Sequence, residues 1–520
     1  MKKQNFLLGT SILIISSFFA KIIGAVYRIP LTNILGAEGL GLYQLIFPLY
    51  STILVFCSTG VPNAIAKIVA TGCKEDIKKT MKLSLLFFGT LSLLFSILLT
   101  ILAKPLSLLQ GNENVTLCYI CIAPAIFLVG IISVLRGYFQ GKQNMLPTAI
   151  SNIVEQFFKL LFGLIFAKMF ITKSITFGAF GAVLGVTISE LFALFVILIE
   201  YFFHKKKEKF VYTNVSKVNL VSLLSIAMPM TLSSLIMPAT LLVDSFLIIN
   251  LLKSINFSTQ LSTNLYGILT GVVNSLINLP VVISMSIATM LIPIISKYHK
   301  ENNTYQVENS SNIALRLILI ISIPCIAIYF IFSNDIINLL FSNGLKIGEL
   351  NEFQVASNML KLASISILFI SIVQITTTLL QAVNQTKVPV FNMLVCCSFK
   401  VLLTVVLVLV PNLNIYGAIV STLVCYLLCA LLNFKTLLNY IIIKLSLRND
   451  ILVPILSSIM MITTMYLIKY LLGSITITLP IMLLCGGVIF CFVYALMTYG
   501  ELYNFNYILS ILKKIKGKIK

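Results

Sequence analysis

The residues of this sequence that could do chemistry are ionisable side chains set inside long apolar runs. The clearest pair is Lys21 and Arg28, in the stretch FFAKIIGAVYRIP that begins at Phe18. On a helix these two cations lie on one face, about two turns and roughly 10 Å apart. Charges buried in a membrane are costly and usually face a cavity or a partner. We therefore expect this face to line a polar interior, the simpler alternative being that Arg28 reaches the outer membrane interface.

Two further cations lie in later apolar runs. Lys159 follows Glu155 by four residues, the favoured order for a helical ion pair, so mutual neutralisation is one interpretation of both. Lys400 has no acidic residue one turn away on its own helix. We expect such a cation to meet an anionic group from elsewhere. Substrate binding is accordingly predicted for four residues: Lys21, Arg28, Lys159 and Lys400. An ammonium and a guanidinium at different depths would suit a diphosphate whose lipid tail stays in the bilayer.

Three acidic residues also lie inside apolar runs, namely Glu155, Glu190 and Asp244. Each could bind Na⁺ or H⁺ as a coupling ion, or could balance a cation across a cleft, with Asp244 opposite Arg28 as one example. Glu190 lies about a dozen residues, or roughly 18 Å, into its run, too deep for a short carboxylate to reach the interface. No other cofactor is expected.

These charges must be held by an all-α integral membrane protein. Of the 520 residues, 59% are hydrophobic and 10% are charged, and the mean hydropathy is +1.04. Soluble domains carry about a quarter charged residues. With about 20 apolar residues per span, the sequence predicts about 14 transmembrane helices, beginning with a retained helix and not a cleaved signal peptide. Membrane lipids are thus partners.

The basic residues predict an orientation. Most of the 37 Lys and Arg fall on one side, including the run HKKKEK from His204 and the tail KKIKGKIK. Cytoplasmic loops of membrane proteins are enriched in Lys and Arg. We therefore expect a multi-pass protein of the cytoplasmic membrane with both termini cytoplasmic, and we do not interpret the net charge of +21 as a nucleic-acid site.

An internal repeat divides the chain. The segment LRGYFQGKQNMLP from Leu135 reappears loosely as LLQAVNQTKVP from Leu379, and a second match follows in register. The repeat predicts a six-helix lobe over 1–210, a second six-helix lobe over 211–445, and two appended helices with a basic tail over 446–520. Six spans preserve polarity, so the two pseudo-symmetric lobes form a parallel repeat, which suits alternating access. Four prolines are the candidate hinges: Pro48, Pro62, Pro280 and Pro293.

Metal and enzyme chemistry find little support in the sequence. Eleven Cys and two His form no grouping typical of a metal site, and the spacing of Cys118 and Cys121 is attributed to helix packing. No nucleophile and base occur in a recognisable arrangement. We predict no catalytic residue and no metal ligand.

The opening of the chain resembles a known family. The stretch YRIPLTNILGAEGLGLYQLIFPLY from Tyr27, followed by GVPNAIAK from Gly60, resembles the stage V sporulation protein B family of polysaccharide exporters. That family belongs to the multidrug/oligosaccharidyl-lipid/polysaccharide flippase superfamily. The resemblance implies a V-shaped cavity between two lobes and the transfer of a lipid-linked peptidoglycan precursor such as lipid II, for the spore cortex. Related flippases carry Arg-x-x-Gly-x-x-Arg in the first helix. Here Lys21 replaces the first Arg, and Arg28 is displaced by one residue from the second.

The leading hypothesis is therefore a flippase for a lipid-linked anionic oligosaccharide. Two alternatives stay open. A cation-coupled multidrug exporter of the same fold would use Glu190 and Asp244 to receive organic cations. A non-transporting membrane partner would recruit cell-wall synthesis enzymes, which are also candidate partners of a flippase.

Overall fold

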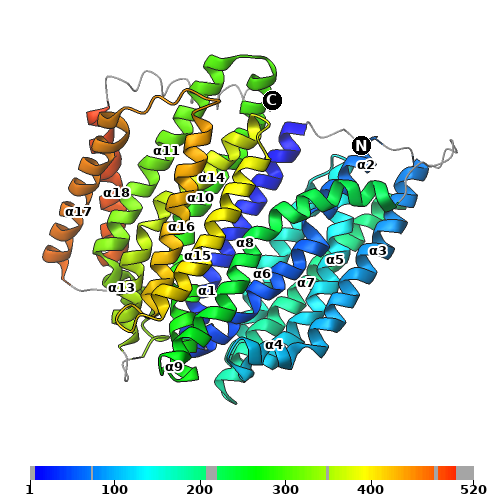
Figure 1. Ribbon diagram of the computed structural model, residues 1–520, viewed down its shortest axis with the longest axis horizontal. Coiled ribbons are helices and arrows are strands. Elements are labelled where there is room, and N and C mark those ends of the chain that lie inside the picture. Colours follow the sequence, from blue (N-terminus) through cyan, green and yellow to red (C-terminus); the bar gives the residue numbers. More distant parts are fainter. Residues whose placement is uncertain (1–5, 72–73, 207–219, 347–350, 474–477, 499–520) are drawn as a thin grey trace.

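The computed structural model describes residues 6–71, 74–206, 220–346, 351–473 and 478–498, and every regular element in these ranges is helical (Figure 1). This confirms the predicted all-α class. The first half of the chain forms α1 (Phe6–Leu54), α2 (Val61–Thr71), α3 (Lys74–Ile101), α4 (Ala103–Leu109), α5 (Thr116–Gly141), α6 (Leu146–Phe170) and α7 (Ile175–Lys206). The π-helix η1 (Val55–Thr59) joins α1 to α2, and the short 3-10 helix η2 (Glu113–Val115) precedes α5.

The second half begins with α8 (Leu220–Ser254), α9 (Thr259–Gly267), the π-helix η3 (Ile268–Val273) and α10 (Asn274–Lys300). It continues through α11 (Thr304–Ile331), α12 (Ser333–Phe341), α13 (Glu352–Ser364), α14 (Ser366–Ala382), α15 (Lys387–Val408) and α16 (Ile415–Leu437). The π-helix η4 (Leu447–Leu452), α17 (Val453–Leu472) and α18 (Thr478–Met497) complete the described chain.

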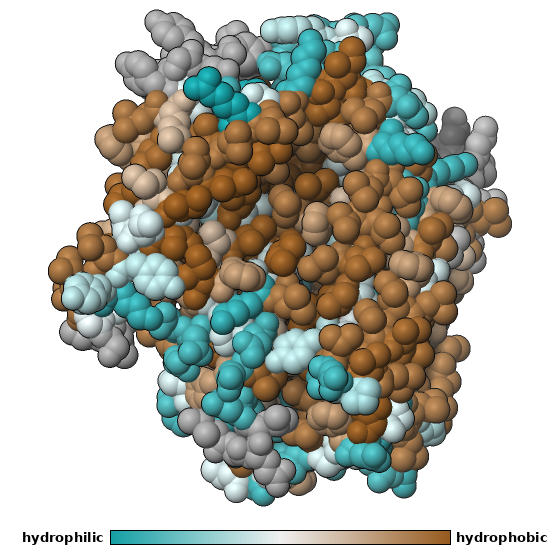
Figure 2. All heavy atoms as spheres, turned by 60° about the vertical axis from the view of Figure 1, so that its left-hand side comes forward, coloured by the Kyte–Doolittle hydropathy of each residue, from teal (hydrophilic) through white to brown (hydrophobic). Residues whose placement is uncertain are grey.

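Most of these helices are long and apolar enough to cross a membrane. Twelve helical stretches meet that description by length and composition in the described residues, and the stretch Ile15–Ala70 alone covers two predicted spans. The span expected near 148–168 is helix α6, which lies outside those twelve. Figure 2 shows the matching surface, a broad apolar band with hydrophilic residues gathered above and below it. The chain is a multi-pass membrane protein.

The helices form two bundles with a pair of helices outside them. In Figure 1, α3, α5 and α7 lie on one side and α10, α14 and α16 on the other, while α17 and α18 stand at the outer edge of the second bundle. Within the bundles, α6 packs on α7 and α15 packs on α16, and α17 contacts α11. The predicted boundary between residues 210 and 211 falls outside the described residues, as does the basic tail.

The first long helix breaks at Gly36, which is none of the four predicted hinges. Gly36 has φ +70° and ψ 180°, a conformation that is strained for other residues. The chain continues as a helix through Pro48 of α1, Pro62 of α2 and the two prolines of α10, so the prolines bend no helix as sharply as Gly36 does. Their role as hinges in a motion stays a prediction.

The two bundles are joined at the end where Gly36 lies, which we call the Gly36 end. Gln110, just after α4, donates a 3.1 Å hydrogen bond to the Ser245 hydroxyl of α8. Asn112 donates a 2.8 Å hydrogen bond to the Thr263 hydroxyl of α9. All four side chains are buried. These polar contacts between the two halves close the space between the bundles from this end.

Backbone packing strengthens the same closure. A Cβ atom placed on Gly267 of α9 would lie 2.3 Å from the Ala37 carbonyl oxygen and 2.6 Å from the Gly41 nitrogen. The helices of the two halves therefore approach each other at a distance that only glycine permits. Small residues allow such close contact between helices in a membrane.

We expect Gly267→Ala to lower thermal stability, by about 1–3 kcal/mol as for other overpacked sites, because the added methyl would separate α1 from α9. Gly487→Ala is the matched control, since a Cβ there meets nothing within 4 Å. Melting temperatures of the purified variants in one detergent give the comparison. Equal melting temperatures for the two variants would contradict the close packing.

Candidate functional site

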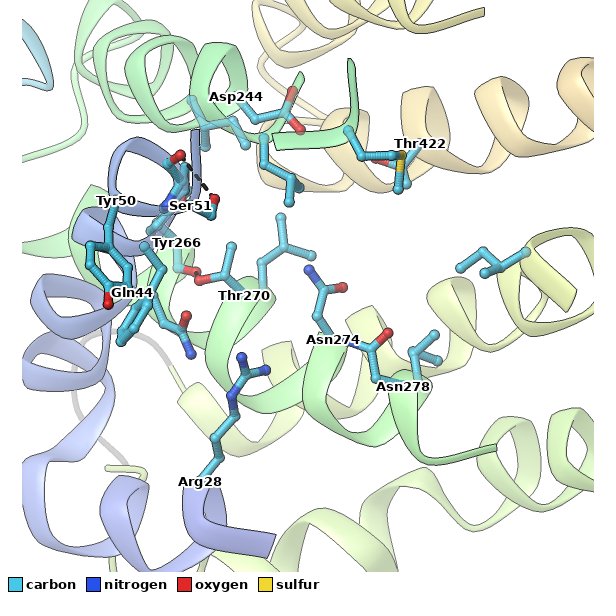
Figure 3. A pocket seen from close by; sticks show the side chains of 18 of the residues that line it. Arg28, Gln44, Tyr50, Ser51, Asp244, Tyr266, Thr270, Asn274, Asn278 and Thr422 are labelled. Carbon is cyan, nitrogen blue, oxygen red and sulfur yellow. Dashed lines mark hydrogen bonds between the residues drawn. The ribbon is translucent and has the colours of Figure 1, made fainter. Parts of the chain in front are cut away.

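A cavity with a volume of about 620 Å³ lies between the two bundles, and both halves of the chain contribute to its wall. Helices α1, α5, α6 and α7 supply one side, and the elements α8, α9, η3, α10, α13, α14, α15 and α16 supply the other. Figure 3 shows part of this wall, with Arg28 and Gln44 of α1 near Thr270 of η3 and Asn274 of α10. The volume is in the range of sites that hold small molecules or parts of larger ones.

Seven Asp, Glu, Lys and Arg side chains line this cavity. Four are basic and three are acidic: Arg28, Arg136, Lys159, Lys400, Glu155, Glu190 and Asp244. Six of them were predicted as site residues from the sequence, and the fold brings all six together from five different helices. Arg136 was missed. The sequence did hold a signal for Arg136. This residue lies in the first copy of the repeated segment, and the second copy has the uncharged Leu380 at the same place, so the shared fold does not require the charge.

The predicted ion pair between Glu155 and Lys159 does not form. The Glu155 carboxylate instead accepts a 3.0 Å hydrogen bond from the Arg136 guanidinium of α5, which also donates to the Ser151 hydroxyl. Gln156 donates a further 3.0 Å hydrogen bond to the same carboxylate. The planar guanidinium of an arginine on the neighbouring helix satisfies this carboxylate better than a lysine one turn away on the same helix.

Lys159 is therefore free of an acidic partner within the described residues. Its ammonium lies 5.3 Å from the centre of the Phe47 ring of α1, a cation–π contact. Phe47 itself lines the cavity. A ring face stabilises a cation without neutralising it, so the positive charge of Lys159 stays available to the cavity.

Arg28 is held in a similar way. One of its guanidinium nitrogens donates a 3.0 Å hydrogen bond to the Ser275 hydroxyl of α10, across the gap between the halves. No acidic side chain pairs with it among the described residues, and the pair with Asp244 that was offered as an example does not form. A neutral hydroxyl orients the guanidinium but leaves its charge and its other donors for a ligand.

Lys400 does have a partner, though not on its own helix. Its ammonium forms a buried ion pair with the Asp244 carboxylate of α8, so the anionic group that it meets belongs to another helix of the same chain, and its binding of substrate stays a prediction. Asp244 thereby has a charge-balancing partner. Its second oxygen, Oδ1, is buried and has no hydrogen-bond partner in the described structure. The pair links α8 to α15 within the wall of the cavity.

Glu190 is the most isolated of the acidic residues. It is buried on α7, and its Oε2 atom has no hydrogen-bond partner among the residues that the structure describes. It lines the same wall as Arg136 and Lys159. A buried carboxylate with no direct partner is costly in its charged form. Among the three acidic groups of the wall, Glu190 is thus the one that no basic side chain binds directly in the described residues.

Lys21 is the predicted site residue that does not line the cavity. It is exposed, and its ammonium contacts the Met285 sulfur of α10, which is also exposed. The first helix thus presents Arg28 to the cavity, and Lys21 lies about two turns nearer to the start of that helix. Among the candidate hinges, Pro48 lines the cavity.

The arrangement is suited to an anion. With all seven groups ionised the wall has one positive charge in excess, and the two cations without an acidic partner, Arg28 and Lys159, are those available to a ligand. No group of three or more residues able to hold a metal ion occurs within the described ranges.

Comparisons with known proteins agree with this geometry. The family model described as polysaccharide biosynthesis protein matches residues 6–299, and the model described as MatE matches residues 269–406. Stage V sporulation protein B of Bacillus subtilis (strain 168) is 29% identical over 459 residues, which cover 86% of each chain. The lipid II flippase MurJ of the same organism is 26% identical over 88% of this chain and 87% of that protein.

A solved structure shares the fold. The structure titled lipid II flippase MurJ, inward closed conformation, aligns with a TM-score of 0.73 over 94% of this chain and 99% of that chain, at 15% identity.

We expect Asp244→Asn and Lys400→Met each to lower stability strongly, by about 3–5 kcal/mol, because each leaves the other charge buried without a partner. The double variant should recover most of the loss. Glu301→Gln serves as the control, since the pair that it breaks with Lys297 is 3.8 Å long and exposed. Thermal unfolding of the wild type, the two single variants and the double variant measures the interaction energy between the two charges. Additive losses of stability in the double variant would contradict the buried pair.

Proposed function

The chain belongs to the polysaccharide biosynthesis protein family, and from this premise we propose that it is a flippase that moves a lipid-linked oligosaccharide across the cytoplasmic membrane. The substrate in this proposal is a lipid-linked peptidoglycan precursor, used in spore cortex synthesis. The names of the two Bacillus subtilis relatives support that choice. Those names describe a sporulation protein and a flippase, in line with the prediction that this chain is not an enzyme.

The observation that carries the proposal is the pair of cations without acidic partners. Arg28 on α1 and Lys159 on α6 line one cavity, and each is held by a neutral group that leaves its charge intact. A diphosphate has several anionic oxygens, which an arginine fork and a lysine ammonium can bind together. The role of Lys21, which lies outside the cavity wall, would be an earlier contact with the head group.

Alternating access supplies the mechanism. The two halves are joined by polar bonds and glycine packing at the Gly36 end. In the proposed topology both termini are cytoplasmic, so the Gly36 end faces outward. Breaking this contact while the halves close at the cytoplasmic end would expose the head group on the other side. The lipid tail would remain in the bilayer throughout.

Glu190 is the proposed site of coupling to an ion gradient. Its carboxylate is buried in the cavity wall and its Oε2 has no partner in the described residues, so it can take up H⁺ or Na⁺ when the cavity changes exposure. Asp244 is a weaker candidate for this role because Lys400 already neutralises it.

A multidrug exporter of the same fold is the second candidate function. The MatE match over residues 269–406 favours it. The wall argues against it, because two of its three acidic groups are bound to basic residues. The groups left without an opposite charge are two cations, Arg28 and Lys159, and one carboxylate, Glu190. Organic cations would find little attraction there.

We expect Arg28→Ala and Lys159→Ala each to slow the flipping of labelled lipid II in reconstituted liposomes by about 10- to 100-fold, the loss of one charge-assisted contact of about 1.5–3 kcal/mol. Lys168→Ala is the control, an exposed lysine at the end of the same helix as Lys159. The proposal is refuted if both cavity variants flip the labelled lipid at the wild-type rate, as judged from the accessibility of the lipid on the two leaflets.

A separate prediction concerns coupling. We expect Glu190→Gln to keep substrate binding but to remove the dependence of transport on the H⁺ or Na⁺ gradient, because the amide cannot ionise. Glu200→Gln, more exposed and on the same helix, should behave as wild type. Transport assays with each gradient imposed in turn decide the matter. Retention of the normal gradient dependence in Glu190→Gln would leave Glu190 as a structural residue.

A further inference from the structure

The cavity has a second wall whose chemistry differs from that of the charged one. Gln44 of α1 and Asn274 and Asn278 of α10 line the same space and present side-chain carboxamides. Asn274 and Asn278 are four residues apart on one helix, so they lie on one face of α10. Figure 3 shows these three residues around the space that Arg28 also enters. We call them the carboxamide wall.

The protein itself does not use these groups. Gln44 is 5% exposed and its Nε2 has no hydrogen-bond partner in the described structure. Asn274 is half-buried and Asn278 is exposed, and no hydrogen bond of either side chain occurs among the described residues. A buried amide such as that of Gln44 normally has a partner, because an unmade hydrogen bond costs free energy, whereas Asn274 and Asn278 keep their amides open to the cavity.

Other asparagine side chains of the same half are bound. Asn264 donates a 2.9 Å hydrogen bond to Glu352, and Asn392 donates one of the same length to Asn433. Gln374 of the same half also has a buried amide oxygen without a partner, but it lies outside the cavity wall. The three residues of the carboxamide wall instead lie together at the cavity. Grouping of this kind indicates that their partner is a ligand.

The carboxamide wall adjoins the cation at Arg28. The guanidinium of Arg28 is held by Ser275, the residue directly after Asn274 on α10. A ligand whose phosphate oxygens are bound by Arg28 therefore has its next chemical group against Asn274 and Asn278. In a lipid-linked oligosaccharide that next group is the first sugar.

We infer that Gln44, Asn274 and Asn278 form a subsite for the first sugar of the substrate, separate from the cations that bind the diphosphate. This rests on the proposed function. A carboxamide both donates and accepts hydrogen bonds, so it pairs with sugar hydroxyl and acetamido groups, which do the same. It has no charge with which to attract a phosphate. The carboxamide wall would distinguish a lipid diphosphate that carries a sugar from one that does not.

The test compares two probes on the purified full-length chain in lipid nanodiscs. One probe is undecaprenyl diphosphate, and the other is the same lipid with one N-acetylated sugar attached. We expect the wild type to bind the sugar-bearing probe about tenfold more tightly or better. The double variant Asn274→Ala with Asn278→Ala should lower this ratio of dissociation constants to near one. Its affinity for undecaprenyl diphosphate should stay as in the wild type, which also shows that the variant is folded.

Two further variants separate the subsite from the proposed function. Arg28→Ala should weaken the binding of both probes by a similar factor and keep the ratio. Asn152→Ala, an asparagine of α6 outside the cavity wall, should change neither. A wild-type ratio near one, or a normal ratio in the double asparagine variant, overturns the subsite while leaving the flippase proposal standing. Binding of both probes that is unaffected by Arg28→Ala overturns the diphosphate site itself.

Discussion

The cost of placing charge inside an apolar helix bundle governs the rest of this structure. Every ionisable side chain there needs an opposite charge, an oriented dipole or a cavity. Two pairs meet this requirement within the protein, Arg136 with Glu155 in the first half and Lys400 with Asp244 in the second. Both pairs line the cavity and both join neighbouring helices. These buried charges are therefore neutralised in the wall of the cavity that is the candidate binding site.

The groups that remain after pairing are the basis of the proposed ligand, with Glu190 assigned to ion coupling in that proposal. Arg28 is oriented by a serine hydroxyl and Lys159 by an aromatic ring, and neither is neutralised by an acidic group of the described residues. The carboxamides of Asn274 and Asn278 face the same cavity from the other half. Most of the charged side chains in the wall thus come from the first half of the chain, and the two asparagines come from the second half. A head group that joins phosphate to sugar matches that division, and an organic cation does not.

The contacts at the Gly36 end hold the two halves of the chain together beside the cavity. Hydrogen bonds between side chains of the two halves combine there with backbone packing at Gly41 and Gly267. Hydrogen bonds in this region can be exchanged for bonds to water when the halves separate, at modest net cost. Such a contact is specific and can also open, which the proposed alternating access requires.

The sequence by itself determined the all-α membrane class, the two-part organisation and six of the seven charges in the cavity wall, because apolar length and isolated charge are properties of the chain alone. Tertiary structure decided which charges pair. Glu155 meets Arg136 and not Lys159, and Lys400 meets Asp244, because helices distant along the chain bring these groups within reach. Gln44 and the two asparagines carried no sequence signal, since a neutral amide in a helix becomes informative only when its surroundings leave it without a partner. The first long helix breaks at Gly36 and not at a proline, with a positive φ that glycine adopts at no steric cost.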